Sequence, residues 1–170
     1  ELAGLEELGR LSEFEKVTPG LVESILQEAA KLAGEVIAPT NRIGDAIGTR
    51  VEDGQVRVAP EFSAAYRQYI DGGWAGLTGN PKHGGQGLPF LINVAVEEMW
   101  QSANLAWSLC PLLTQGAAHA LEAHGSDQLR ATYAPKLTTG EWTGTMNLSE
   151  PQAGSDLAAI RTQAVPEGDH

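Results

Sequence analysis

The chain is 170 residues long, which is within the usual size range of one folded domain. Its hydrophobic residues make up 42% of the sequence, close to the globular average, so a sizeable core can form. The 22 acidic residues outnumber the 11 basic residues and give a formal net charge of -11. We therefore expect no nucleic-acid partner, because neutralising phosphates requires lysine and arginine. A small anionic ligand is still compatible with this charge, since backbone N–H groups can hold phosphate.

Cysteine content and apolar runs bear on the cellular setting. Cys110 is the single cysteine, so no intrachain disulfide can form, which fits a reducing compartment. It lies in an apolar stretch and is expected to be a small buried side chain. No apolar run approaches the roughly 18–20 residues of a membrane span. Residues 1–5 lack the features of a signal peptide. We therefore predict a cytoplasmic protein without a membrane span. Because the chain lacks an initiator methionine, we expect residues to precede it.

The first half of the chain is predicted to be helical. Thr18-Pro19 is typical of an N-cap followed by proline at the first helical position. An apolar stripe then predicts a helix that ends at Pro39. The stripe consists of Leu21, Ile25, Ala29, Leu32 and Val36. The glycine-punctuated run 44–53 is expected to be a loop, and a second helix is predicted at 62–70.

The second half is predicted to contain two long helices and a short one. The glycine-rich stretch 74–87 is expected to form a tight surface loop. Helices are predicted at 89–102 and 105–124. The second is interrupted by Pro111 but apolar around most of its surface, so it should be central to a bundle. Ser126 is expected to cap a further short helix that closes at Pro135.

After Gly140 the pattern changes from helical to extended. Residues 142–148 favour extended structure, and residues 160–165 predict a second strand. We therefore predict a mainly α fold, with a helical bundle in residues 1–139. Residues 140–170 are expected to be the start of a truncated β domain.

Most familiar catalytic patterns are absent from the sequence. His119 and His124 are five residues apart, unlike paired metal ligands on a helix, and no HExxH occurs, so no metal site is predicted. Ser149 and Ser155 lie outside a GxSxG elbow, which argues against a serine hydrolase. The adjacent glutamates at 97–98 are expected to be solvated.

The turn at residues 154–156 has a more specific interpretation. Gly154 has no Cβ, so a ligand can approach its backbone. Ser155 offers a hydroxyl donor, and Asp156 can stabilise the turn by accepting nearby N–H groups. Ser149 and the backbone of 146–148 can line the same site. Such a surface suits a flat, hydrogen-bonding heterocycle, although an ordinary turn is the alternative.

The sequence closely resembles the acyl-CoA dehydrogenase family. Residues 146–156, MNLSEPQAGSD, are similar to its first signature, Thr/Ser-Glu-Pro-x-x-Gly-Ser-Asp. Residues 133–141, YAPKLTTGE, and 84–88, GGQGL, resemble the flanking regions, and the glutamates at 97–98 fall where the family carries such a pair. The resemblance covers nearly the whole chain in order. The long loop at 44–57 is more like the larger bacterial subgroup.

This resemblance implies a fold and a reaction. The family has an N-terminal helical domain, a middle β domain and a C-terminal four-helix domain, so the chain is expected to be an N-terminal fragment, inactive alone. The reaction is α,β-dehydrogenation of an acyl-CoA thioester in fatty acid β-oxidation. A glutamate removes the α-proton while the β-hydride passes to FAD. That glutamate lies in the family's C-terminal domain, so no catalytic residue is assigned here. Glu150 is expected to be structural.

The resemblance also implies binding residues. It puts Met146, Leu148 and Ser149 against the flavin of FAD, with Ser149 near the pyrimidine side. Gly154 and Ser155 fall where the family contacts FAD and the CoA chain. Met146 stands where the family is often aromatic, so backbone contacts but no side-chain hydrogen bond are expected from it. The floor of the acyl pocket is assigned to Trp107, Ser108, Pro111 and Leu112.

Partners follow from the same resemblance. We expect an acyl-CoA substrate, electron-transfer flavoprotein or a similar acceptor, and a homo-oligomer of the full-length protein. Two alternatives stay open. One is an acyl-CoA oxidase or related flavoprotein that passes electrons to oxygen. The other is a stand-alone, non-catalytic helical interaction domain.

Overall fold

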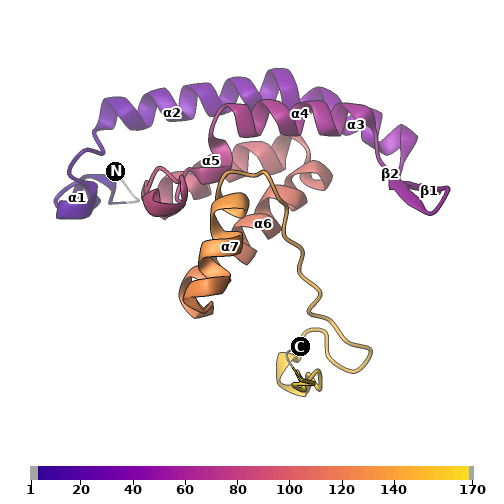
Figure 1. Ribbon diagram of the computed structural model, residues 1–170. Helices are drawn as coiled ribbons and strands as arrows, with labels where there is room; N and C mark the ends of the chain where they lie inside the picture. The colour runs from indigo at the N-terminus through magenta and orange to yellow at the C-terminus, as the bar shows by residue number, and fades with distance from the viewer. Residues whose placement is uncertain (1–3, 169–170) are drawn as a thin grey trace.

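The computed structural model describes residues 4–168, and its fold is mainly helical (Figure 1), as predicted. The α-helices are α1 (Leu5–Leu8), α2 (Pro19–Lys31), α3 (Ala38–Ile47), α4 (Pro60–Asp71), α5 (Phe90–Ala103), α6 (Leu105–His124) and α7 (Asp127–Thr138). Shorter elements are η1 (Ser12–Phe14), the π-helical η2 (Leu32–Ile37), η3 (Trp74–Gly76), η4 (Pro81–His83) and η5 (Leu157–Ala159). Strands β1 (Arg50–Glu52) and β2 (Gln55–Arg57) form a hairpin. Residues 1–3 and 169–170, the ends of the two predicted domains, lie outside the described range.

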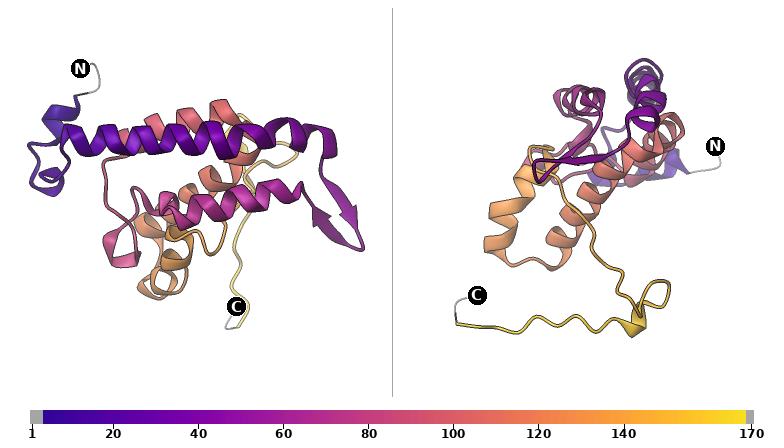
Figure 2. Two further views of the ribbon diagram at one scale, coloured as in Figure 1. Left: turned by 90° about the horizontal axis from the view of Figure 1, so that it is seen from above. Right: turned by 90° about the vertical axis from the view of Figure 1, so that its right-hand side faces the viewer.

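Helices α2, η2 and α3 form one long helical rod across the molecule (Figure 2). It begins as predicted, with the Leu21 amide donating to the Thr18 hydroxyl at 3.2 Å. The prediction that it ends at Pro39 is wrong, and so is the loop expected from Gly44. Pro39 lies at the start of α3, directly after the wider turns of the π-helical η2, and the helix continues through it. The rod therefore continues to Ile47.

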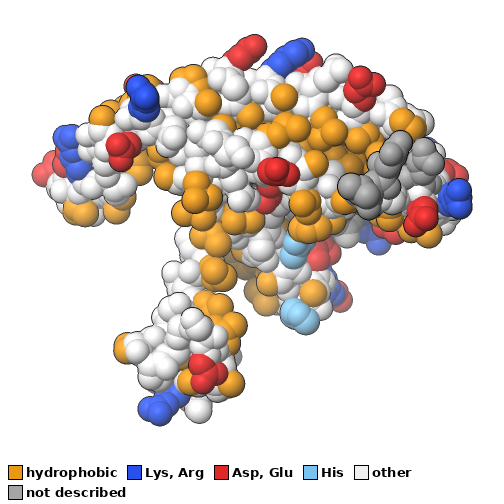
Figure 3. Space-filling view, turned by 180° about the vertical axis from the view of Figure 1, so that it is seen from behind, with side chains coloured by type: hydrophobic (Ala, Val, Ile, Leu, Met, Phe, Trp, Pro, Cys, Tyr) orange, Lys and Arg blue, Asp and Glu red, His pale blue; other side chains and the backbone are white. Residues whose placement is uncertain are grey.

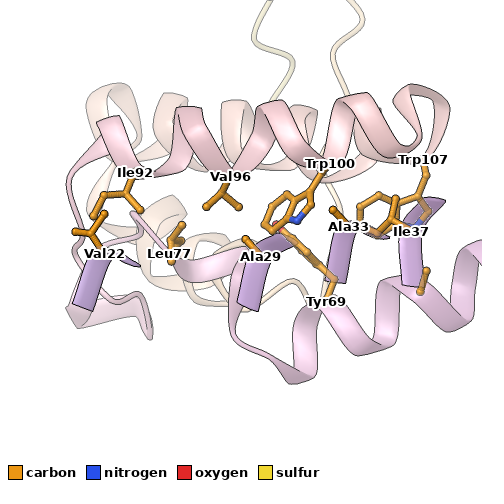
Figure 4. Packing of buried hydrophobic residues seen from close by; sticks show 11 residues of the cluster. Val22, Ala29, Ala33, Ile37, Tyr69, Leu77, Ile92, Val96, Trp100 and Trp107 are labelled. Carbon is orange, nitrogen blue, oxygen red and sulfur yellow. The ribbon is translucent and has the colours of Figure 1, made fainter. Parts of the chain in front are cut away.

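The buried face of the rod includes most of the predicted stripe, because Ala29 is buried and Ile25, Leu32 and Val36 pack against the core from partly buried positions. Val22, Ala29, Ala33 and Ile37 are buried, whereas Leu21 is 40% exposed. The last three are four residues apart, and the wider turn of η2 keeps them in line. Small alanine side chains let α5 pack closely against this face (Figure 4).

Aromatic side chains from four elements fill the centre of the core. Tyr69 packs edge-on against Trp100 and Trp107, with ring centroids 5.1 Å and 5.7 Å away, and Trp74 packs against Trp100 at 5.5 Å. Trp107 Nε1 donates to the Phe62 carbonyl at 3.1 Å. Trp100 Nε1 is buried without a hydrogen-bond partner among residues 4–168. Figure 4 shows Tyr69 and Trp100 pointing toward each other.

The glycine-rich stretch connects α4 and α5, as predicted, but part of it is packed inside the molecule. Gly76 and Leu77 are buried. The returning chain donates from Gly87 N to Gly79 O at 3.0 Å and from Leu88 N to Leu77 O at 3.0 Å. On its outer side, His83 Nδ1 lies 2.5 Å from a carboxylate oxygen of α6. Close backbone packing therefore explains the glycine content better than an open surface loop.

Helices α6 and α7 pack against each other and both continue through an internal proline. The Ser126 hydroxyl accepts from the Leu129 amide at 3.3 Å, which confirms the predicted cap. The predicted interruption at Pro111 and the predicted end at Pro135 are wrong. Tertiary packing therefore overrides the helix breaks that the local sequence alone favours.

The paired strands lie at 50–57, where the sequence predicts a loop over 44–53 and, from Val56 and Val58 on either side of Arg57, a short extended piece. Val51 pairs with Val56 in a hairpin whose turn has positive φ at Asp53 and Gly54. The strand expected at 160–165 is absent from the described residues, and 142–148 are extended without a ladder. A strand needs a hydrogen-bonding neighbour, and within 140–168 only an isolated bridge forms.

Candidate functional site

The motif-bearing segment leaves the helical body at the middle of α6. Trp142 anchors the approach, because its amide donates to the Lys136 carbonyl at 3.0 Å and the Lys136 ammonium lies 4.1 Å from its ring centre. Gly144 then crosses α6, with its amide donating to the Thr114 hydroxyl at 3.1 Å. A Cβ on Gly144 would lie 2.5 Å from the Ala117 Cβ, so this close crossing requires glycine. From here the chain extends away from the helices (Figure 1).

The run that follows, 145–149, presents an extended and unpaired backbone. Its N–H and C=O groups have no hydrogen-bond partner within residues 4–168. Met146 is 61% exposed and Leu148 is 40% exposed. The Ser149 hydroxyl also has no partner in this range. The segment therefore offers both hydrogen-bonding edges and apolar side chains to a flat ligand.

The turn beyond it is built largely as expected. The Asp156 carboxylate accepts from the Ala158 amide at 3.2 Å and caps η5. A Cβ on Gly154 would meet nothing within 4 Å, so the backbone there is open to a ligand. Ser155 is exposed beside it. Ser149, Gly154 and Ser155 thus lie on one short exposed segment.

The Glu150 carboxylate organises this turn. It accepts the amides of Arg161 at 3.0 Å and Thr162 at 2.9 Å. The Thr162 hydroxyl and the Gln152 side-chain amide donate to it as well. Glu150 and Ala153 also exchange backbone hydrogen bonds at 2.9 Å and 3.0 Å. These contacts give Glu150 a structural environment, as the sequence led us to expect.

Glu150 is expected to titrate far below an ordinary glutamate. The Thr162 hydroxyl and the amides of Arg161 and Thr162 lower its pKa from 4.5 to about 2, because they bind only the ionised form well. Its contribution to loop stability is therefore complete above pH 4.5 and is lost as pH falls through about 2. Carbon-detected NMR of the Glu150 side-chain carboxyl, recorded as a function of pH, measures the midpoint of its titration. A midpoint near 4.5 would contradict these hydrogen bonds.

Residues assigned to the acyl pocket lie on the inner side of α6. Trp107 and Ser108 are each 4% exposed, and Pro111 is also buried. Trp107 reaches the edge of a groove of about 600 Å³ between α4 and α6. Leu112, by contrast, is 36% exposed on the outer side. The structure therefore separates Leu112 from the other three.

The outer side of α6 was missed in sequence reasoning. Its exposed positions are Leu105, Leu109, Leu112 and Gly116, hereafter the outer stripe. Their spacings of four, three and four residues put them on one helical face. Open space lies over Gly116, since a Cβ there would meet nothing within 4 Å. The helix is therefore not surrounded by the other described helices, and apolar side chains remain visible at the surface (Figure 3).

Two other expectations about single residues are wrong. Cys110 is exposed and lines the groove beside Trp107. Glu97 is half-buried, whereas Glu98 is exposed as expected. Burial raises the pKa of Glu97, while hydrogen bonds from Asn93 and Gln101, both at 3.3 Å, oppose this rise. Glu97 belongs to a polar contact between α5 and α6, because Asn93 also donates to the Gln115 side chain at 2.9 Å.

Two features are absent from the described residues. Within 4–168, no three His, Cys, Asp or Glu side chains are grouped closely enough to hold a metal ion. None of the helices in that range combines the length and hydropathy needed to cross a membrane.

The chain is similar to known proteins of the family that the sequence motifs resemble. The family model "Acyl-CoA dehydrogenase, N-terminal domain" matches residues 22–141. The chain is 49% identical over 144 residues to the 3-methylmercaptopropionyl-CoA dehydrogenase of Ruegeria pomeroyi, covering 85% of this chain and 24% of that protein. It is 32% identical over 139 residues to a butyryl-CoA dehydrogenase of Syntrophomonas wolfei, covering 80% and 23%. It is 30% identical over 153 residues to the mitochondrial isovaleryl-CoA dehydrogenase of Bos taurus, covering 87% and 33%. The aligned regions span about a quarter to a third of these relatives.

Proposed function

Because the chain belongs to the acyl-CoA dehydrogenase family, we propose that the protein containing it performs FAD-dependent α,β-dehydrogenation of an acyl-CoA thioester. The observation that carries this proposal is the exposed motif at 146–156, which follows the point where the chain crosses α6 at Thr114. The chain spans only part of its relatives, so the activity is proposed for the longer protein.

A domain boundary near Gly140 is part of the proposal. Helix α7 ends at Thr138, and Gly140 has a φ of 76° that turns the chain. The Tyr66 hydroxyl donates to the Gly140 carbonyl at 3.0 Å and ties this turn to the helical body. We assign residues 1–139 to a helical domain and 140–170 to the start of a β domain. The unpaired backbone of 145–149 supports this, because further strands would give it partners.

The exposed motif suits FAD. A flat ring with hydrogen-bond donors and acceptors can pair with the free backbone of 145–149, while Met146 and Leu148 cover it with apolar atoms. Ser149 donates near the polar edge of the ring. Gly154 and Ser155 contact the rest of the cofactor and the CoA chain. FAD would supply the acceptor for the hydride.

The outer stripe of α6 suits the acyl chain. Leu109 and Leu112 are 45% and 36% exposed, and Gly116 leaves room for a ligand against the helix. Packing an acyl chain here would exclude water from it. Trp107, Ser108 and Pro111 form the buried layer beneath and hold the helix in position. The substrates in the relatives' names have short acyl groups, so we assign a short acyl-CoA as the substrate.

The remaining roles belong to other parts of the protein or to partners. The catalytic glutamate is assigned to a C-terminal helical domain, and none of the described residues is assigned as the base. Electrons leave to electron-transfer flavoprotein or a similar acceptor, and the full-length protein is a homo-oligomer. A cytoplasmic location fits the single cysteine.

Anaerobic titration of the full-length protein tests this function. We expect purified protein to carry FAD and its flavin absorbance to bleach when butyryl-CoA or 3-methylmercaptopropionyl-CoA is added. In a separate aerobic assay, reoxidation by an artificial acceptor without oxygen consumption distinguishes a dehydrogenase from an oxidase. Protein that binds no flavin and oxidises no acyl-CoA would contradict the proposal and favour a non-catalytic interaction domain.

A further inference from the structure

The loop from Glu150 to Thr162 is held together by its own hydrogen bonds. Its backbone bridge joins Glu150 and Ala153, and Asp156 caps η5 within it. No hydrogen bond joins it to residues 4–149. The ribbon shows the same separation, since the loop lies apart from the helices (Figure 1). Its shape must therefore come from contacts inside the loop.

The Glu150 carboxylate makes the contacts that close the loop. One oxygen accepts the Thr162 amide at 2.9 Å and the Thr162 hydroxyl. The other accepts the Arg161 amide at 3.0 Å and the Gln152 side chain. These donors lie up to twelve residues along the chain. Since both oxygens receive two donors, the carboxylate is fully used as an acceptor.

The position of Glu150 connects the two halves of the proposed cofactor surface. It directly follows Ser149, at the end of the extended run, and precedes Gly154 and Ser155 in the turn. Closing the loop at Thr162 fixes the path of the chain between these halves. If it opened, Ser155 would move independently of Ser149.

We propose that Glu150 is a positioning residue, whose carboxylate closes the loop 150–162 and holds Ser149, Gly154 and Ser155 in one arrangement for FAD. This inference rests on the proposed function. Glu150 does not act as a base, because its oxygens are occupied by donors from the loop itself. Its depressed pKa agrees, since the donors that close the loop bind the ionised carboxylate better than the protonated form.

The chemistry of the contact identifies the variant to use. Glutamine has nearly the shape of glutamate but only one acceptor oxygen, and its NH₂ group would face donors. Glu150→Gln therefore breaks the closure without changing side-chain size. Glu141→Gln is the matched control, because the exposed Glu141 is nearby and accepts only from Lys136, at 3.2 Å.

The first measurement concerns the loop alone, in the 170-residue chain. We expect Glu150→Gln to speed amide hydrogen exchange at Arg161 and Thr162 by roughly tenfold or more, because charge-assisted hydrogen bonds are lost. Exchange in α5 and α6 should stay unchanged, and Glu141→Gln should match wild type throughout. Unchanged exchange at Arg161 and Thr162 in Glu150→Gln overturns the closure.

The second measurement concerns FAD binding by the full-length protein. We expect Glu150→Gln to weaken FAD binding by about 10- to 100-fold, the range for residues that orient a binding group. At saturating FAD, kcat and KM for acyl-CoA should return close to wild type. An FAD affinity equal to that of Glu141→Gln overturns the inference, and so does a kcat that stays low at saturating FAD. If wild type itself binds no FAD, the proposed function fails, while hydrogen exchange still reports on loop closure.

Discussion

Replacing Trp100 with alanine is expected to lower the free energy of unfolding by about 3–5 kcal/mol. The Trp100 side chain is 1% exposed and packs edge-on against Tyr69 and Trp74, so its removal leaves a large cavity at the centre of the core. Urea unfolding followed by circular dichroism measures the change. A loss below about 1 kcal/mol would mean that the core collapses around the site.

A pair of phenylalanine substitutions separates packing from hydrogen bonding in the same core. Trp107→Phe removes the indole that donates to the Phe62 carbonyl, which adds about 0.5–1.5 kcal/mol to the cost of lost packing. Trp100→Phe removes an indole N–H that has no partner among residues 4–168, so it loses packing alone. We expect Trp107→Phe to be the more destabilising of the two. Equal losses would contradict the hydrogen-bond assignment.

Replacing Gly85 with alanine is expected to cost about 3 kcal/mol or more of unfolding free energy. An added Cβ would lie 2.0 Å from the Gly79 carbonyl oxygen and 2.1 Å from its carbon. The atoms that this Cβ would meet all belong to the Gly79 backbone, so no side-chain rotation can relieve the clash. The glycine-rich stretch would therefore have to open, which also disturbs the buried Leu77. Urea unfolding of the variant gives the measurement.

Gly116→Ala is the matched control for this substitution. Gly116 lies inside α6, and a Cβ there would meet nothing within 4 Å. Alanine should therefore stabilise the helix by about 0.5–1 kcal/mol. The two glycine-to-alanine changes thus have expected effects of opposite sign. Destabilisation by Gly116→Ala would mean that the surface of α6 is not open at this position.

The sequence predicts where the helices lie along the chain far better than it predicts which side of each helix is buried. The cap at Thr18 uses a contact three residues away, which the local sequence contains. On α5, Val94 is 51% exposed, whereas Ile92 and Val96 are buried. Apolar residues occur on both sides of this helix, so periodicity cannot choose between them. Packing against the rod formed by α2, η2 and α3 decides which side of α5 is buried.

The candidate site could be predicted in part for the same reason. Asp156 bonds to an amide two residues away, and this follows from local sequence. Glu150 bonds to residues eleven and twelve positions along the chain, which no local pattern contains. The motif itself was recognised by resemblance. The outer stripe of α6 was not predicted, because apolar residues around most of a helix suggest complete burial.

The uncovered outer stripe also affects how copies of this chain behave toward one another. Apolar surfaces attract in water, while a formal charge of -11 at pH 7 makes copies repel. This repulsion fades as pH approaches the isoelectric point of about 4.7. Self-association through leucines 105, 109 and 112 is therefore strongest in mild acid and is increased by salt, which screens the charge. Colloidal stability of this chain thus depends on its acidic surface.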